Sequence, residues 1–79
     1  MKLINLLKKM KSHQYVSIFN ESGSIKIDGT VLELWVKYDT IEDWEQEFAI
    51  YQSKVLSIES WEDGGATWIN IVVDYKEED

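Results

Sequence analysis

Two β-prone segments joined by a tight-turn dipeptide constrain this chain more than any other feature. Residues 54–75 carry alternating apolar side chains on both sides of Asp63-Gly64. Asp-Gly is favoured in two-residue type I′ turns, because both turn residues take positive φ angles. A turn at this dipeptide places Ile58 opposite Ile69 and gathers apolar side chains on one face. The segment therefore predicts an antiparallel hairpin over residues 54–75.

Residues 15–28 predict a second hairpin. The segment begins with the β-prone sequence Tyr-Val-Ser-Ile-Phe and continues into Asn-Glu-Ser-Gly at residues 20–23. Asn at the first position and Gly at the fourth suit a type I turn. With those four residues as the loop, Ile18 faces Ile25. The apolar pattern and the turn chemistry thus predict the same pairing.

Two further segments predict helices. Residues 2–12 have lysines near their end, where cations favour the helix dipole, and apolar side chains at helical spacing, namely Leu3, Leu6, Leu7 and Met10. Residues 40–52 start at a plausible N-cap, Thr40, and place on one helix face the side chains of Ile41, Trp44, Phe48 and Tyr51.

Residues 30–38 fit two different structures. Apolar side chains alternate from Leu32 to Tyr38, which favours a strand. Thr30 and Glu33 have the spacing of a capping box, which favours the start of a helix. We take the strand as the prediction and keep the helix as the alternative.

These elements follow the order α-β-β-β-α-β-β. Runs of antiparallel strands combined with helices predict an α+β fold, here an antiparallel sheet of about five strands with two helices. The 79 residues make a single domain, residues 1–79. The last residues, 76–79, read Lys-Glu-Glu-Asp and predict a disordered acidic tail.

The residue types missing from the chain exclude several kinds of site. There is no cysteine and a single histidine, His13, so the ligand sets of zinc sites are lacking. No serine lies in a nucleophile-elbow sequence, and no glycine-rich phosphate loop is present. We therefore predict no enzymatic activity, no metal and no cofactor.

The beginning of the chain does not resemble a targeting segment. Its apolar residues are interrupted by Asn5, Lys8 and Lys9, and no small-residue cleavage site follows. No apolar run approaches the roughly 20 residues of a membrane span. We therefore predict a cytoplasmic protein that does not bind membranes.

Charge is distributed unevenly along the chain. Eight lysines stand against fifteen carboxylates, which gives a net charge of −7, and arginine is absent. Four of the lysines lie in residues 1–11, which contain no acid. Nucleic-acid binding needs a basic surface and commonly arginine, so we predict no direct nucleic-acid binding. A basic protein is the expected partner.

The acidic residues are densest at residues 39–47, where five carboxylates lie within nine residues. Closely spaced carboxylates can imitate the phosphates of nucleic acid, and exposed tryptophans are typical interface anchors. The alternative is a solvated helix face that makes no contact. The predicted partner-binding residues are Asp39, Glu42, Asp43, Glu45 and Glu47, with Trp35 and Trp61 as anchors.

Four stretches within residues 3–34 and 54–60 read Leu-Ile-x-Leu-Leu-Lys-Lys-Met, Tyr-Val-Ser-Ile-Phe-Asn-Glu-Ser-Gly, Ile-Asp-Gly-Thr-Val-Leu-Glu-Leu and Lys-Val-Leu-Ser-Ile-Glu-Ser. In this order they resemble small phage and prophage proteins of unknown function. The resemblance implies an accessory protein acting in a bacterial host cell. It implies an inhibitor of a defence protein, of the anti-CRISPR or antirestriction type, whose partner is a CRISPR or restriction enzyme. The alternative is an assembly component that forms a homo-oligomer through a strand edge or tryptophan patch.

Overall fold

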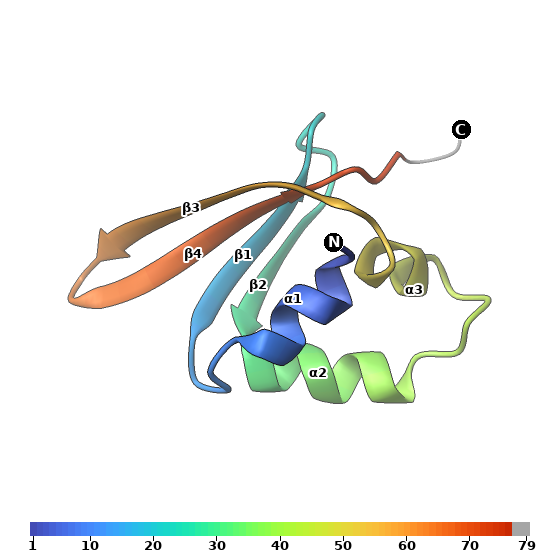
Figure 1. The fold of residues 1–79 in the computed structure, drawn as a ribbon, viewed down its shortest axis with the longest axis horizontal. Coiled ribbons are helices and arrows are strands. Elements are labelled where there is room, and N and C mark those ends of the chain that lie inside the picture. Colours follow the sequence, from blue (N-terminus) through green and yellow to red (C-terminus); the bar gives the residue numbers. More distant parts are fainter. Residues whose placement is uncertain (77–79) are drawn as a thin grey trace.

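The computed structural model describes residues 1–76 and has an α+β architecture, so the predicted fold class is confirmed. Within these residues, three helices pack against one face of a four-stranded sheet (Figure 1). The elements are α1 (Leu3–Lys9), β1 (Tyr15–Asn20), β2 (Lys26–Thr30), α2 (Val31–Thr40), α3 (Gln46–Tyr51), β3 (Val55–Asp63) and β4 (Ala66–Val73). Of the predicted acidic tail, residues 77–79 lie outside the described residues.

The sheet is mixed, with the strand order β2-β1-β4-β3. β1 pairs antiparallel with β2, and β3 pairs antiparallel with β4, as two hairpins. The hairpins meet in the middle of the sheet, where β1 and β4 run parallel. The predicted antiparallel sheet of about five strands is therefore wrong, both in strand number and in strand direction.

The missing strand is residues 30–38: Thr30 ends β2, and the residues after it form most of α2. Thr30 Oγ1 accepts a hydrogen bond from the Glu33 N–H at 3.2 Å, and Glu33 Oε1 accepts one from the Thr30 N–H at 3.2 Å. This capping box starts the helix, and Val31 and Leu34 then enter the core at helical spacing. The alternating pattern is misleading, because Leu32 stays 56% exposed.

The second predicted helix, residues 40–52, is much shorter than expected. Thr40 is the last residue of α2 and its Oγ1 donates to the Lys37 carbonyl at 3.0 Å, so it is not the N-cap of a new helix. Helix α3 begins only at Gln46. The intervening residues form turns, in which Glu45 Oε2 accepts from the Glu42 N–H at 3.2 Å. Helix α1, predicted for residues 2–12, is also shorter.

The first hairpin forms with a longer loop than predicted. Ile18 pairs with Ile27 rather than with Ile25. Asn20 Oδ1 accepts a hydrogen bond from the Ile25 N–H at 3.1 Å, which holds Ile25 in the loop. The register differs by two residues, so each side chain keeps its predicted face.

The second hairpin turns at Gly64-Gly65 instead of Asp63-Gly64. Both glycines have positive φ, 60° and 89°, as a type I′ turn requires. Asp63 consequently pairs with Ala66, and Ile58 pairs with Ile71 instead of Ile69. This shift is again two residues and preserves the faces.

The core lies between the helices and the two central strands. β1 contributes Val16 and Ile18, and β4 contributes Ile71 and Val73, all with at most 1% exposure. The three helices supply the other buried apolar side chains, which are Leu3, Ile4 and Leu7 from α1, Val31 and Leu34 from α2, and Ile50 and Tyr51 from α3. None of the helices in residues 1–76 is both long and apolar enough to cross a bilayer.

β3 lies outside this core. Its residues after Val55 are all exposed, and the far ends of β3 and β4 project beyond the helices (Figure 1). The sheet face turned away from the helices, which we call the open face, carries alternate side chains of every strand. The fold therefore leaves two uncovered surfaces, the open face and the outer edge of β3.

Candidate binding surfaces

The acidic segment, residues 39–47, runs from the end of α2 to the start of α3. The structure keeps the five predicted carboxylates on this connection, at the end of the molecule opposite the tip of the β3–β4 hairpin (Figure 1). Asp39, Glu42, Asp43 and Glu45 are exposed. Glu47 is half-buried and forms an ion pair with Lys37 at 2.8 Å.

Trp44 lies in the middle of the acidic segment and is 79% exposed. An open groove of about 500 Å³ lies beside it, lined in part by Asp43, Glu45, Tyr75 and one cationic residue, Lys76. Carboxylates next to an indole suit a lysine or arginine side chain, because the ring attracts the cation as well. The acidic segment thus contains both a charge and an aromatic surface for a basic group.

Trp44 is not among the predicted binding residues, because the helix predicted for residues 40–52 places it on the apolar face. The helix is absent at this position, so the side chain points away from the core. A signal was present in the sequence: Asp43 has a like charge four residues away on both sides, at Asp39 and at Glu47. Like charges at this spacing weaken a helix, which argues against a helix around Trp44.

The two predicted aromatic anchors do not join the acidic segment. Trp35 lies on α2, half-buried against the core, with Lys8 Nζ 5.4 Å from its ring centroid. Trp61 lies on β3, at the opposite end of a molecule 38 Å long (Figure 1). The predicted single surface therefore separates into an acidic segment and a strand-edge tryptophan.

An aromatic row crosses the open face near the tip of the second hairpin. Tyr15 stacks on Trp68 with ring centroids 5.1 Å apart, and Trp68 stacks on Trp61 at 6.0 Å. These separations are those of rings in direct contact. The row links three neighbouring strands, β1, β4 and β3, on the open face.

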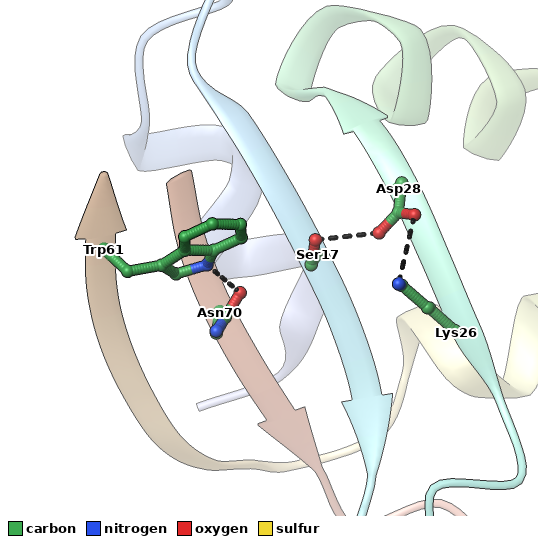
Figure 2. Close-up of polar contacts among 5 residues, drawn as sticks. All are labelled: Ser17, Lys26, Asp28, Trp61 and Asn70. Atoms are coloured by element: carbon green, nitrogen blue, oxygen red, sulfur yellow. Dashed lines mark hydrogen bonds and ion pairs between the residues drawn. The ribbon is translucent and has the colours of Figure 1, made fainter. Parts of the chain in front are cut away.

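Beside the aromatic row, hydrogen bonds link side chains of neighbouring strands on the open face (Figure 2). Ser17 Oγ donates to Asp28 Oδ1 at 2.7 Å, and Asp28 also approaches Lys26 Nζ at 3.8 Å. The Trp61 Nε1–H donates to Asn70 Oδ1 at 2.7 Å. The indole therefore leans over β4, away from the outer edge of β3 (Figure 2).

A second charged surface lies on the lysine-rich first helix. An open groove of about 640 Å³ beside α1 is lined in part by Lys2, Lys8 and Lys54. Lys2 Nζ donates to Gln52 Oε1 at 3.0 Å. The charge asymmetry seen in the sequence is thus kept in the helical layer, with lysines on α1 and carboxylates after α2.

Within residues 1–76, no three histidine, cysteine, aspartate or glutamate side chains are grouped so that they could hold a metal ion. Comparison with protein-family models, curated proteins and solved structures finds no match to the chain. The resemblance to phage proteins therefore stays a prediction.

Proposed function

We propose that this chain is a non-catalytic binding protein that engages a basic protein through the acidic segment. The observation that carries the proposal is the position of Trp44, 79% exposed among acidic side chains. A tryptophan so exposed gains little by folding, so its apolar surface is free to be buried by a partner. The surrounding carboxylates make that partner a basic one.

Electrostatics supports the same proposal. Asp39, Glu42, Asp43 and Glu45 are exposed and form no ion pair within residues 1–76, although Lys76 lines the same groove as Asp43 and Glu45. A lysine or arginine stacked on an exposed indole gains about 0.5–1 kcal/mol, and more when desolvated. Each exposed ion pair between a carboxylate of the segment and a cation of the partner adds about 0.2–1 kcal/mol. Long-range attraction speeds association and weakens as salt increases.

Among basic proteins, we propose a nucleic-acid-binding protein as the partner, with inhibition of a host defence enzyme as the outcome. A protein that binds phosphates presents lysines and arginines at short intervals. The acidic segment presents four exposed carboxylates within residues 39–45. Occupation of the same basic cleft would make the chain a competitor of nucleic acid.

Capture from a bacterial lysate tests this proposal when matched variants are compared. The wild-type chain, Trp44→Ala and the double variant Asp43→Lys/Glu45→Lys are immobilised, with Glu21→Lys in the β1–β2 turn as the charge control. We expect the wild type and the control to retain basic proteins that duplex DNA displaces, and the other two variants to lose them. Equal retention by all four chains, or no displacement by DNA, would contradict the proposal.

A further inference from the structure

The outer edge of β3 is open over most of its length. β3 is an edge strand, and its inner side pairs with β4. Among residues 1–76, hydrogen bonding covers only its beginning on the outer side, where the Val55 N–H donates to the Met1 carbonyl at 2.8 Å. Within the described part of the chain, residues 56–63 make no backbone hydrogen bond on that side. Outward-facing N–H and C=O groups are a template for another strand.

Several of the usual protections against pairing are missing from this edge. Proteins protect edge strands with charged side chains, above all lysine, and with proline, β-bulges, shortness or a covering element. In β3 the register irregularity lies at the start of the strand, between Val55 and Ser57, and the charges further along are all carboxylates. Residues 56–63 contain no lysine and no proline, and in Figure 1 this part of β3 projects beyond the helices. The other edge strand, β2, is only five residues long and carries Lys26. The difference singles out β3 as the edge that can accept a strand.

The side chains of β3 add apolar surface beside the open backbone. Leu56 and Ile58 are 44% and 51% exposed, and Trp61 is 41% exposed. Because the Trp61 indole is held over β4 by Asn70, it does not shield the outer edge (Figure 2). A strand laid along β3 would bury apolar side chains in addition to pairing the backbone.

Charge identifies the occupant. Residues 56–63 carry Glu59, Glu62 and Asp63 and no cation. Two copies of β3 paired edge to edge would bring both sets of carboxylates into the same interface. Like charges opposite each other destabilise strand pairs. A segment with lysine or arginine on its alternate positions would instead compensate them. A second copy of this chain is therefore the less favourable occupant.

We propose that the outer edge of β3 binds an extended segment of a basic protein as a fifth strand. Glu59 and Asp63 lie on the open face, where they select cations on one face of the added strand. Ile58 lies on the other face and selects an apolar side chain there. This site lies at the opposite end of the molecule from the acidic segment and does not depend on it (Figure 1).

The test uses a synthetic peptide and the full ¹⁵N-labelled chain. The probe is acetylated and amidated Thr-Lys-Val-Lys-Val-Lys-Val-Thr, which when extended carries lysine on one face and valine on the other. We expect NMR shift changes centred on residues 56–63 and a slowing of amide hydrogen exchange there by about tenfold or more at saturation. The amides of β2 should not respond.

Two controls separate strand addition from simple charge attraction. The same peptide N-methylated at alternate amides keeps its charges but cannot pair its backbone, and we expect it not to bind. The variant Glu59→Lys/Asp63→Lys should bind the original peptide about tenfold more weakly, whereas Glu21→Lys should bind like the wild type. The amide spectrum of each variant reports whether it has kept its fold.

Three results would overturn the proposal. Equal binding of the N-methylated peptide would show that charge alone attracts the probe. Shift changes confined to residues 39–47 would place the peptide on the acidic segment. Light scattering that gives a dimer, with residues 56–63 protected in the absence of peptide, would show that a second copy occupies the edge.

Discussion

Replacing Thr30 by alanine tests whether the capping box decides the structure of residues 30–38. The Thr30 hydroxyl accepts from the Glu33 N–H at 3.2 Å and lies 2.9 Å from Glu33 Oε1, so the change removes both contacts. Loss of a threonine N-cap costs about 1 kcal/mol, within a range of 0.5–2 kcal/mol. Helix α2 has ten residues, too few to persist without caps and packing.

The loss should be visible in the stability of the whole domain. Val31 and Leu34 lie in the first turns of α2 and are buried, so fraying of this end would uncover the core. For a domain of this size, about 1 kcal/mol lowers Tm by roughly 4–8 °C. Thermal and urea unfolding followed by circular dichroism would measure the difference between Thr30→Ala and the wild type.

Two matched variants make this measurement decisive. Thr40→Ala removes the same group from the last residue of α2, where its hydroxyl donates to the Lys37 carbonyl rather than capping free N–H groups. It should change the free energy of unfolding by less than about 0.5 kcal/mol. Thr30→Ser should restore the cap. If Thr30→Ala were as stable as Thr40→Ala, the box would not be what selects the helix.

Three other changes have distinct expected outcomes. Among residues 1–76 the buried hydroxyl of Tyr51 finds no hydrogen-bond partner, so Tyr51→Phe should raise the free energy of unfolding by about 1 kcal/mol in urea titrations. Burial, with a smaller effect of Glu47, raises the pKa of Tyr51 to about 12. The folded chain therefore keeps this proton where the unfolded chain loses it, and wild-type stability should fall between about pH 10 and 12 while Tyr51→Phe lacks this decrease. Trp44→Ala should alter stability by less than about 0.5 kcal/mol, and a larger loss would mean that the indole supports the fold. Ile71→Ala, at a position with 0% exposure, should cost about 2–5 kcal/mol by the same assay, and a cost below that range would contradict its place in the core.

The sequence predicted both hairpins but not their registers. Asp63-Gly64 and Gly64-Gly65 are both acceptable type I′ turns, so local chemistry alone does not choose between them. In the structure, the turn at the two glycines places Trp61 opposite Trp68, and their rings stack at 6.0 Å. A cross-strand aromatic pair is a stabilising term that a turn rule leaves out.

The parallel pairing of β1 with β4 was beyond what local patterns can predict. Ile18 and Ile71 are partners in the sheet although they lie near opposite ends of the chain. Alternation and turn residues specify neighbours along the chain, whereas this pairing depends on how two completed hairpins pack against shared helices. The five acids of the acidic segment, in contrast, could be predicted as a group, because they lie close together in the sequence itself.

The small size of the helical layer explains why the chain leaves so much of its sheet uncovered. Helices α1, α2 and α3 have seven, ten and six residues, and the fully buried strand side chains they cover come from β1 and β4. A domain of this length buries only about 60% of its unfolded surface. β3 is therefore held by its pairing with β4 and by the aromatic row rather than by a helix. An edge supported from one side only keeps its outer backbone groups available, so the shortage of covering helix creates the surface that we propose a partner strand fills.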